Sequence, residues 1–508
     1  MKKKSLFLTF AAMLLTLGTL SACAGSKNSL VIWVGSESVA FYREKAKQFL
    51  KDNPDFGMKL TIVGADAGGA AGQMVSDNTA CGDIVTIAND NIGKLSELSY
   101  ITPIIDEETL NQINTDNPES FKKVIKNYLG DGKTDPNVYT FAVPYISQAL
   151  FLYYDTRYVT DEQAQTFEGL EAAAAAYDAA NGVTGTKSFV VSGTDGFNYS
   201  FPLLARNLQV EHPELGGYSK TRIYEGGKQK DCYNQTNDAV AVARYMQRNL
   251  ARTNGGLLDL AGSDWSSYVE KHAALAFIGG AWHYNAFKDA VTSDKKVYMG
   301  CAPIPTFTLT AEDVAGIEDV NYPNDENLPE ELRGSADPAP KAGDKYRGGS
   351  FVDCKSFVIN MASLNGDPEK YYKSCKLLRY FSSKEVQNES FKEALNVPAY
   401  VGSSEYIESV KDEVDTTAYL MARAQTGMSA FGIAQPFTNG KFNTYYYQNK
   451  APDEYANMIK NTNDKYGTIE KIREALFTME YIWKNGSAPN KSSKDYPTSF
   501  PANTTTKY

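Results

Sequence analysis

An alternation of short apolar runs and amphipathic segments near the start of the chain most constrains its fold. Residues 30–34 read LVIWV, a continuous apolar run that is typical of a strand buried on both faces. From Tyr42 onward the apolar residues recur at the spacing of one helix face, and residues 58–63 and 83–87 form two further apolar runs. This strand–helix–strand order predicts a parallel sheet with helices on both faces.

The same order places two polar loops at one edge of the predicted sheet. Ligands of such sheets bind beyond the carboxyl ends of the strands. Residues 35–38 follow the first strand, and residues 88–91 follow the third. We therefore expect both loops to line one binding edge.

A second alternating segment begins at a joint marked by Pro144. The pattern there predicts strands at 139–145, 150–154, 188–191 and 274–278, and helices at 170–180 and 238–252. Residues 368–484 have an almost entirely helical pattern. The predicted fold class is therefore α/β, in a chain of 508 residues that is long enough for two to four domains.

Residues 312–345 differ from their surroundings, because they hold ten acidic residues, several prolines and little apolar periodicity. We interpret this stretch as an inserted, solvated surface loop. Clustered carboxylates also suit calcium, but the ligand spacing of an EF-hand is absent. Residues 485–508 are predicted to form a polar tail.

The first 22 residues have the layout of a secretory signal peptide, with lysines at positions 2–4, an apolar run over 6–20 and small residues after it. The sequence Leu20-Ser21-Ala22-Cys23 resembles the lipobox of bacterial lipoproteins. That resemblance implies cleavage before Cys23, lipidation of Cys23 and a position on the extracellular face of the cell membrane. The alternatives are a signal peptide with a chance cysteine and an uncleaved membrane anchor, for which the apolar run is short.

Composition excludes several classes of function. The net charge is −10, and loss of the three N-terminal lysines makes it −13, so a nucleic-acid partner is not expected. The chain has no GxxxxGK loop for ATP, and its three histidines show no zinc-binding spacing, so no metal or cofactor is expected. Five cysteines remain beyond Cys23, and they leave room for one disulfide that the sequence does not identify.

Several segments, in order along the chain, resemble one known family. The most specific is Tyr268–Trp282, in which a helix end precedes a small-residue strand, two glycines and a tryptophan. The others are the strand that contains Trp33, the GDIV stretch at 82–85, the Pro144 region and the LNVPA stretch at 395–399. Together they resemble the carbohydrate branch of the extracellular solute-binding proteins of ABC transporters, typified by the maltodextrin-binding proteins.

The resemblance spans about residues 29–484 and implies a two-lobed periplasmic-binding-protein fold, with the hinge crossed three times, near 146, 306 and 365. It implies these segments: signal peptide 1–22; lipidated spacer 23–29; N-lobe 30–146 and 307–365, with the 312–345 insertion; C-lobe 147–306 and 366–484; tail 485–508. A sugar would lie in the cleft between the lobes, and hinge closure would bury it.

A sugar site needs flat aromatic surfaces for C–H faces, and donors and acceptors for hydroxyls. Aromatic residues make up 12% of the chain, and tyrosine is the most frequent. Ordinary core filling is the alternative explanation of that excess. The resemblance then implies these candidate ligand-binding residues: Glu37, Asp90, Gln148, Asp195, Asn198, Tyr199, Trp282, Tyr284, Phe442 and Tyr445.

Three of these candidates have competing interpretations. Glu37 and Asp90 also suit helix N-termini, where a short acidic side chain caps backbone N–H groups. Trp282 also suits a core, but its place after Gly279-Gly280 at a strand end favours binding. Departures from the maltodextrin binders at Ser38, Ile87 and Gly196 favour "carbohydrate" over "maltose" as the ligand class.

The predicted protein is therefore a non-enzymatic, monomeric lipoprotein that captures an oligosaccharide and delivers it to the permease subunits of an ABC importer. Two alternatives stay open. One is a binder of a peptide or another solute on the same fold. The other is a glycoside hydrolase with paired carboxylates in a cleft, for which no catalytic motif is present.

Overall fold

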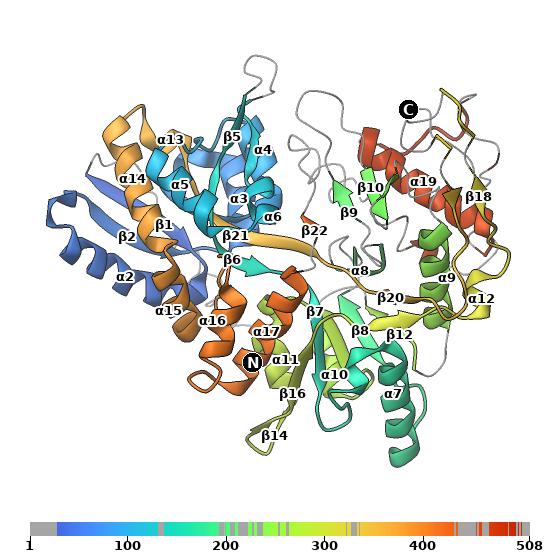
Figure 1. Ribbon diagram of the computed structural model, residues 1–508. Helices are drawn as coiled ribbons and strands as arrows, with labels where there is room; N and C mark the ends of the chain where they lie inside the picture. Colours follow the sequence, from blue (N-terminus) through green and yellow to red (C-terminus); the bar gives the residue numbers. More distant parts are fainter. Residues whose placement is uncertain are drawn as a thin grey trace, which may run out of the picture. The chain divides into compact units, whose positions relative to one another are not determined.

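The computed structural model describes residues 28–130, 137–192, 198, 200–203, 209–211, 222–225, 228–230, 237–251, 255–260, 264–321, 323–326, 333–334, 336–430, 433–434, 454, 457–459, 467–485, 487–493, 496 and 499. The chain forms two compact units (Figure 1). Unit 1 comprises Met1–Ile146 and Cys354–Val401, and unit 2 comprises Ser147–Asp353 and Gly402–Tyr508.

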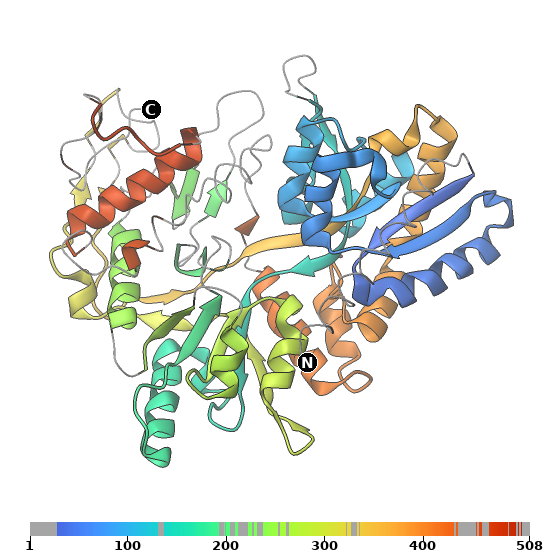
Figure 2. The same ribbon diagram turned by 180° about the vertical axis from the view of Figure 1, so that it is seen from behind.

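The sheet of unit 1 has the strand order β2-β1-β3-β21, and β6 also pairs with β21. The strand β1 (Ser29–Val34) is parallel to β2 (Lys59–Gly64) and to β3 (Ile84–Ala88), as the apolar runs predict. The strand β21 (Phe351–Ile359) is antiparallel to β3. The strand β6 (Ala142–Gln148) lies beside β21 (Figure 1, Figure 2).

Helices surround this sheet, and aromatic rings fill its core. Tyr145 stacks on Phe357 with ring centroids 4.1 Å apart, and Tyr42 packs edge-on against both. The helices and remaining strands of unit 1 are α2 (Val39–Asp52), α3 (Ala67–Asp77), α4 (Ile92–Glu97), α5 (Glu107–Asp116), α6 (Glu119–Val124), β4 (Lys126–Tyr128), β5 (Val138–Thr140), α13 (Met361–Leu364), α14 (Pro368–Phe381) and α15 (Lys384–Ala394).

The main sheet of unit 2 has the strand order β12-β8-β13-β7-β16. The strand β8 (Phe189–Ser192) is parallel to β12 (Leu257–Leu260) and to β13 (Ala276–Gly279). The strand β7 (Phe151–Asp155) runs antiparallel to β13 and to β16 (Met299–Ala302). The N-terminal end of β7 therefore meets the C-terminal end of β13, with Phe151 paired to Gly279.

Smaller strands and several helices complete unit 2, in which α19 lies beside α9 (Figure 2). These elements are α7 (Phe167–Asn181), α8 (Ser200–Leu203), β9 (Gln209–Glu211), β10 (Arg222–Glu225), β11 (Lys228–Lys230), α9 (Asn237–Ala251), α10 (Trp265–Glu270), α11 (Tyr284–Ala290), β14 (Thr292–Ser293), β15 (Lys296–Val297), β17 (Thr306–Thr308), α12 (Ala311–Val314), β18 (Val320–Asn321), β19 (Ala336–Asp337), β20 (Lys345–Arg347), α16 (Ser403–Ser409), α17 (Thr416–Ala430), β22 (Ile433–Ala434) and α19 (Ile469–Asn485).

The division into units differs from the expected lobes at two segments. Residues 307–353 belong to unit 2 rather than to the N-lobe, because β17 pairs with β20 inside that unit. Residues 366–401 belong to unit 1 rather than to the C-lobe, because α14 packs on α2 and α5 there. The first boundary between the two units follows Ile146.

The acidic stretch 312–345 is more than a solvated loop. Asp313 and Asp337 are buried, which corrects the expectation for these two carboxylates. Asp313 accepts hydrogen bonds from Arg248 Nε at 3.0 Å and Nη2 at 3.1 Å, and Asp337 accepts one from the backbone N–H of Asn237 at 3.1 Å. These bonds attach the stretch to α9, since a buried carboxylate requires such partners.

Candidate functional site

Two predicted residues of unit 1 follow neighbouring parallel strands at their carboxyl ends. Glu37 lies in the short turn 36–38 after β1 and is exposed, and its carboxylate folds back over Gly35. Asp90 lies in the turn 89–91 after β3 and accepts a hydrogen bond from Asn91 Nδ2 at 2.8 Å. The structure therefore places both carboxylates at one edge of the unit 1 sheet.

Backbone and side-chain hydrogen bonds fix these two turns. Asn89 Oδ1 accepts from the N–H of Cys354 at 3.0 Å, which holds the start of the turn that carries Asp90. Asn396 Nδ2 donates to Ser38 Oγ at 3.0 Å, next to Glu37. The role of Asn396 could not be predicted locally, although it lies in the LNVPA segment that the sequence singled out.

In unit 2, Trp282 is the most prominent of the predicted residues. It lies in the turn 281–283 immediately after β13 and is 44% exposed, among the largest exposures of a bulky apolar side chain in the described residues. An exposed indole presents a flat apolar face that the ring of a ligand can cover. The centroid of the indole lies 5.4 Å from that of the His283 ring, and part of the side chain faces solvent.

Two glycines make room for this arrangement. A Cβ atom on Gly280 would lie 2.1 Å from Cζ3 of the Trp282 ring, so the indole rests directly on the Gly280 backbone. A Cβ on Gly279 would lie 2.2 Å from the Phe277 ring and 2.6 Å from His283 Nδ1. Since real Cβ atoms do not approach so closely, a larger residue at Gly279 would displace buried rings, and one at Gly280 would displace the indole of Trp282.

Tyr284 differs from Trp282, because its side chain is buried. Its hydroxyl lies 2.7 Å from Thr417 Oγ1 and accepts from Lys288 Nζ at 3.2 Å. The expected role of Tyr284 as a second stacking surface does not match this position inside unit 2. The residue instead attaches α11 to the start of α17, where Asp415 lies 3.7 Å from Lys288 Nζ.

Gln148 and Asn198 are both buried in unit 2. Gln148 precedes β7, whose first residue pairs with Gly279, so Gln148 lies near the sheet edge that carries Trp282. Asn198 comes after β8 in the sequence, and no described contact joins it to that edge. The remaining candidates lie outside the described residues: Asp195, Tyr199, Phe442, Tyr445 and the lipidation candidate Cys23.

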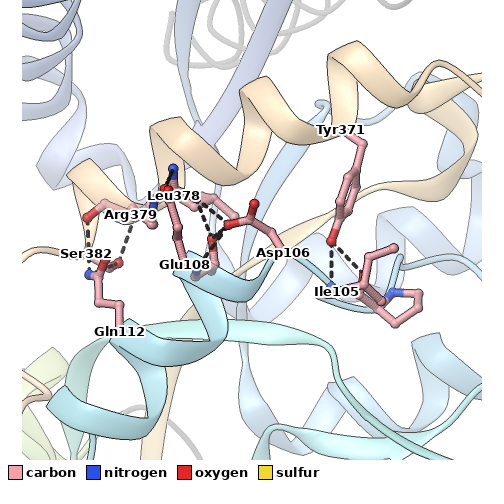
Figure 3. A network of polar contacts seen from close by, with 10 residues as sticks. Ile105, Asp106, Glu108, Gln112, Tyr371, Leu378, Arg379 and Ser382 are labelled. Atoms are coloured by element: carbon pink, nitrogen blue, oxygen red, sulfur yellow. Dashed lines mark hydrogen bonds and ion pairs between the residues drawn. The ribbon is translucent and has the colours of Figure 1, made fainter.

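A concave region with a volume of about 690 Å³ lies in unit 1 between α5 and α14, away from the residues predicted from the sequence. Figure 3 shows that the charged side chains there bind one another. Arg379 contacts Asp106 and, at 2.6 Å, Glu108, while Asp106 also accepts from the N–H of Thr109 at 2.9 Å. Lys373 pairs with Glu369 at 2.6 Å on the same helix. The contacts of Arg379 with Asp106 and Glu108 join α14 to the start of α5.

Comparison with known proteins identifies the fold. The family model described as "Bacterial extracellular solute-binding protein" matches residues 44–418, about three quarters of the chain. This protein belongs to that family. Solute-binding proteins are not enzymes and act in ABC transport, so membership excludes the hydrolase alternative and implies a solute ligand and a transporter partner.

Solved structures similar to this solute-binding protein include "Maltodextrin binding protein MalE1 from L. casei BL23 without ligand", with a TM-score of 0.62 and 16% identity. A second structure, whose title reads "with acarbose", gives the same values, and each match covers 91% of this chain and 100% of the other. At this identity the likeness establishes the periplasmic-binding-protein-like α/β fold. No curated protein matches in sequence.

The described part of the chain contains no group of three or more His, Cys, Asp or Glu side chains arranged to hold a metal ion. Among the helices that the structure describes, none has the length and apolar character needed to cross a membrane.

Proposed function

We propose that this solute-binding protein captures an oligosaccharide of the maltodextrin type and delivers it to the permease of an ABC importer. The observation that carries the proposal is the exposed Trp282 ring at a sheet edge that also carries polar side chains. An indole face covers the C–H face of a sugar ring, and neighbouring amides and carboxylates bind its hydroxyls.

The similar structures support the same ligand class, since one is of a maltodextrin-binding protein and the other is described as "with acarbose". Within this chain we assign hydroxyl binding to Glu37, Asp90 and the buried amide Gln148. An amide at that position avoids the cost of burying a further charge. We assign stacking to Trp282, with Tyr284 supporting the same edge.

Calorimetric titration tests the ligand class. We expect linear glucose oligomers to bind with a Kd in the micromolar range, about −8 kcal/mol, and peptides of similar size to give no heat of binding. An unrelated oligosaccharide such as a β-linked xylan fragment is the matched sugar control. Tight binding of peptides together with no response to any oligosaccharide would establish the alternative, a peptide-binding protein of the same family.

The proposed lipid anchor has its own test. We expect Cys23→Ala to move the protein from the membrane fraction to the medium or the soluble fraction, because one cysteine carries the acyl chains. Cys81→Ala, at a buried cysteine in unit 1, is the control and should leave the distribution unchanged. Retention of the Cys23→Ala protein in the membrane would favour the uncleaved-anchor alternative instead.

A further inference from the structure

The turn that carries Trp282 is held by hydrogen bonds on both polar atoms of Gly280. The Gly280 N–H donates to Nδ1 of His283 at 3.3 Å, and the Gly280 carbonyl accepts from the N–H of His283 at 3.0 Å. The same carbonyl also accepts from the Tyr153 hydroxyl at 3.0 Å. One peptide segment is thus fixed from two sides directly beneath the indole ring.

Both side chains that make these bonds are themselves fixed by packing. The His283 ring meets Trp265 edge-on at 5.2 Å and Phe277 edge-on at 4.9 Å. Tyr153 is fully buried in β7 and stacks on Phe287 at 5.0 Å. Rigid neighbours of this kind confine each side chain to one orientation, which is the condition for holding a binding residue in place.

The ionisation states of His283 and Tyr153 at neutral pH fit their hydrogen bonds to Gly280. Burial lowers the pKa of His283 to about 4, so at neutral pH the imidazole is uncharged and Nδ1 can accept the hydrogen bond from the Gly280 N–H. Burial raises the pKa of Tyr153, so its hydroxyl keeps the proton that it donates. Both groups therefore hold the required form at pH 7.

We propose that His283 and Tyr153 are positioning residues that set the plane of the Trp282 ring for its ligand through the Gly280 peptide. The ring lies directly over the Gly280 backbone, because its benzo edge occupies the space that a Cβ of Gly280 would need. A shift of the Gly280 peptide therefore moves the ring. This inference rests on the proposed function only for its effect on sugar affinity.

Three variants test the inference, with 19F resonances of 5-fluorotryptophan as a readout that needs no ligand. His283→Leu removes the acceptor, His283→Asn keeps an oxygen near the position of Nδ1, and Tyr153→Phe removes only the hydroxyl. We expect His283→Leu and Tyr153→Phe to shift the Trp282 resonance, assigned with Trp282→Phe. The Trp33 resonance in unit 1 should not move, and His283→Asn should restore the original spectrum.

The affinity for a linear glucose oligomer provides the second readout. Loss of one hydrogen bond to the Gly280 peptide should raise the Kd roughly five- to tenfold, with His283→Asn close to the parent protein. Tyr177→Phe, a hydroxyl deletion in α7 of the same unit, is the matched control. A Trp282 resonance and a Kd unchanged in both His283→Leu and Tyr153→Phe would overturn the inference.

The two readouts separate the inference from the proposed function. Should the parent protein bind no oligosaccharide while His283→Leu still shifts the Trp282 resonance, the proposed ligand is wrong and the positioning role stands. Should His283→Leu fail to fold, Tyr153→Phe still decides, because it removes one atom from a buried ring and keeps the ring's packing.

Discussion

Replacing Lys370 with methionine is expected to lower the free energy of unfolding by about 3–5 kcal/mol. Lys370 Nζ lies 2.5 Å from Asp83 Oδ1, and the two side chains are only 3% and 2% exposed. The substitution leaves a buried carboxylate without its counter-charge, and water cannot reach it to compensate. Chemical denaturation followed by circular dichroism measures the loss.

The position of the pair explains why the loss should be large. Asp83 Oδ2 also accepts from the N–H of Val31 at 2.6 Å, and Lys370 Nζ also donates to the carbonyl of Ser363 at 3.0 Å. The ion pair therefore joins β1, the residue before β3 and the start of α14. Removal of either partner therefore also weakens the attachment between these three segments.

A lysine one turn further along the same helix provides the control. Lys373 pairs with Glu369, but that glutamate is 74% exposed. Lys373→Met should cost less than about 1 kcal/mol, since solvent screens such pairs. Equal denaturation midpoints for Lys370→Met and Lys373→Met would show that the buried pair contributes little.

The parallel sheet of unit 1 could be predicted because each of its strands is marked by local pattern. The runs at 30–34, 58–63 and 83–87 are rich in apolar and β-branched residues, and β1, β2 and β3 occupy these positions within one residue. Such residues favour strands, and the central strand β3 is buried along most of its length. The edge that carries Glu37 and Asp90 follows directly from that topology.

The assignment of later segments to units could not be predicted, because it depends on contacts between residues far apart in the sequence. The pattern of α14 shows which of its faces is apolar, but not which sheet that face covers. Its place in unit 1 involves packing on α2 and α5 and the ion pair of Lys370 with Asp83. Similarly, the buried state of Asp313 depends on Arg248, and an acidic composition suggests only solvation.

Contacts between distant residues also explain why Trp282 is exposed and Tyr284 is buried. Both are aromatic residues just after Gly279-Gly280, and sequence favours each as a stacking surface. Tyr284 is buried, and its hydroxyl forms hydrogen bonds with Thr417 and Asp415. Both partners come from a distant part of the chain. The i,i+4 spacing of Tyr284 and Lys288 on α11 is a weak local sign of that network. His283 had no recognisable signal.

Trp282→Ala is expected to weaken oligosaccharide binding by about 30- to 150-fold. The exposed 44% of the side chain corresponds to about 110 Å² of a large aromatic residue. Covering that area with a sugar face stabilises the complex by about 2–3 kcal/mol at roughly 25 cal/mol per Å². Each 1.4 kcal/mol is about a tenfold change in Kd, which isothermal calorimetry resolves.

Tyr372→Ala separates a local effect from a general one. Tyr372 is another exposed aromatic residue, at 52%, but it lies on α14 beside the concave region of unit 1 rather than at a predicted binding edge. Its removal should leave the Kd unchanged, and Trp282→Phe should fall between the parent protein and Trp282→Ala, because a smaller ring covers less area. An affinity lost equally in Tyr372→Ala would mean that exposed aromatic area, and not the edge after β13, governs binding. Unchanged affinity in Trp282→Ala would remove the tryptophan from the site and, with it, the main support for a stacked sugar.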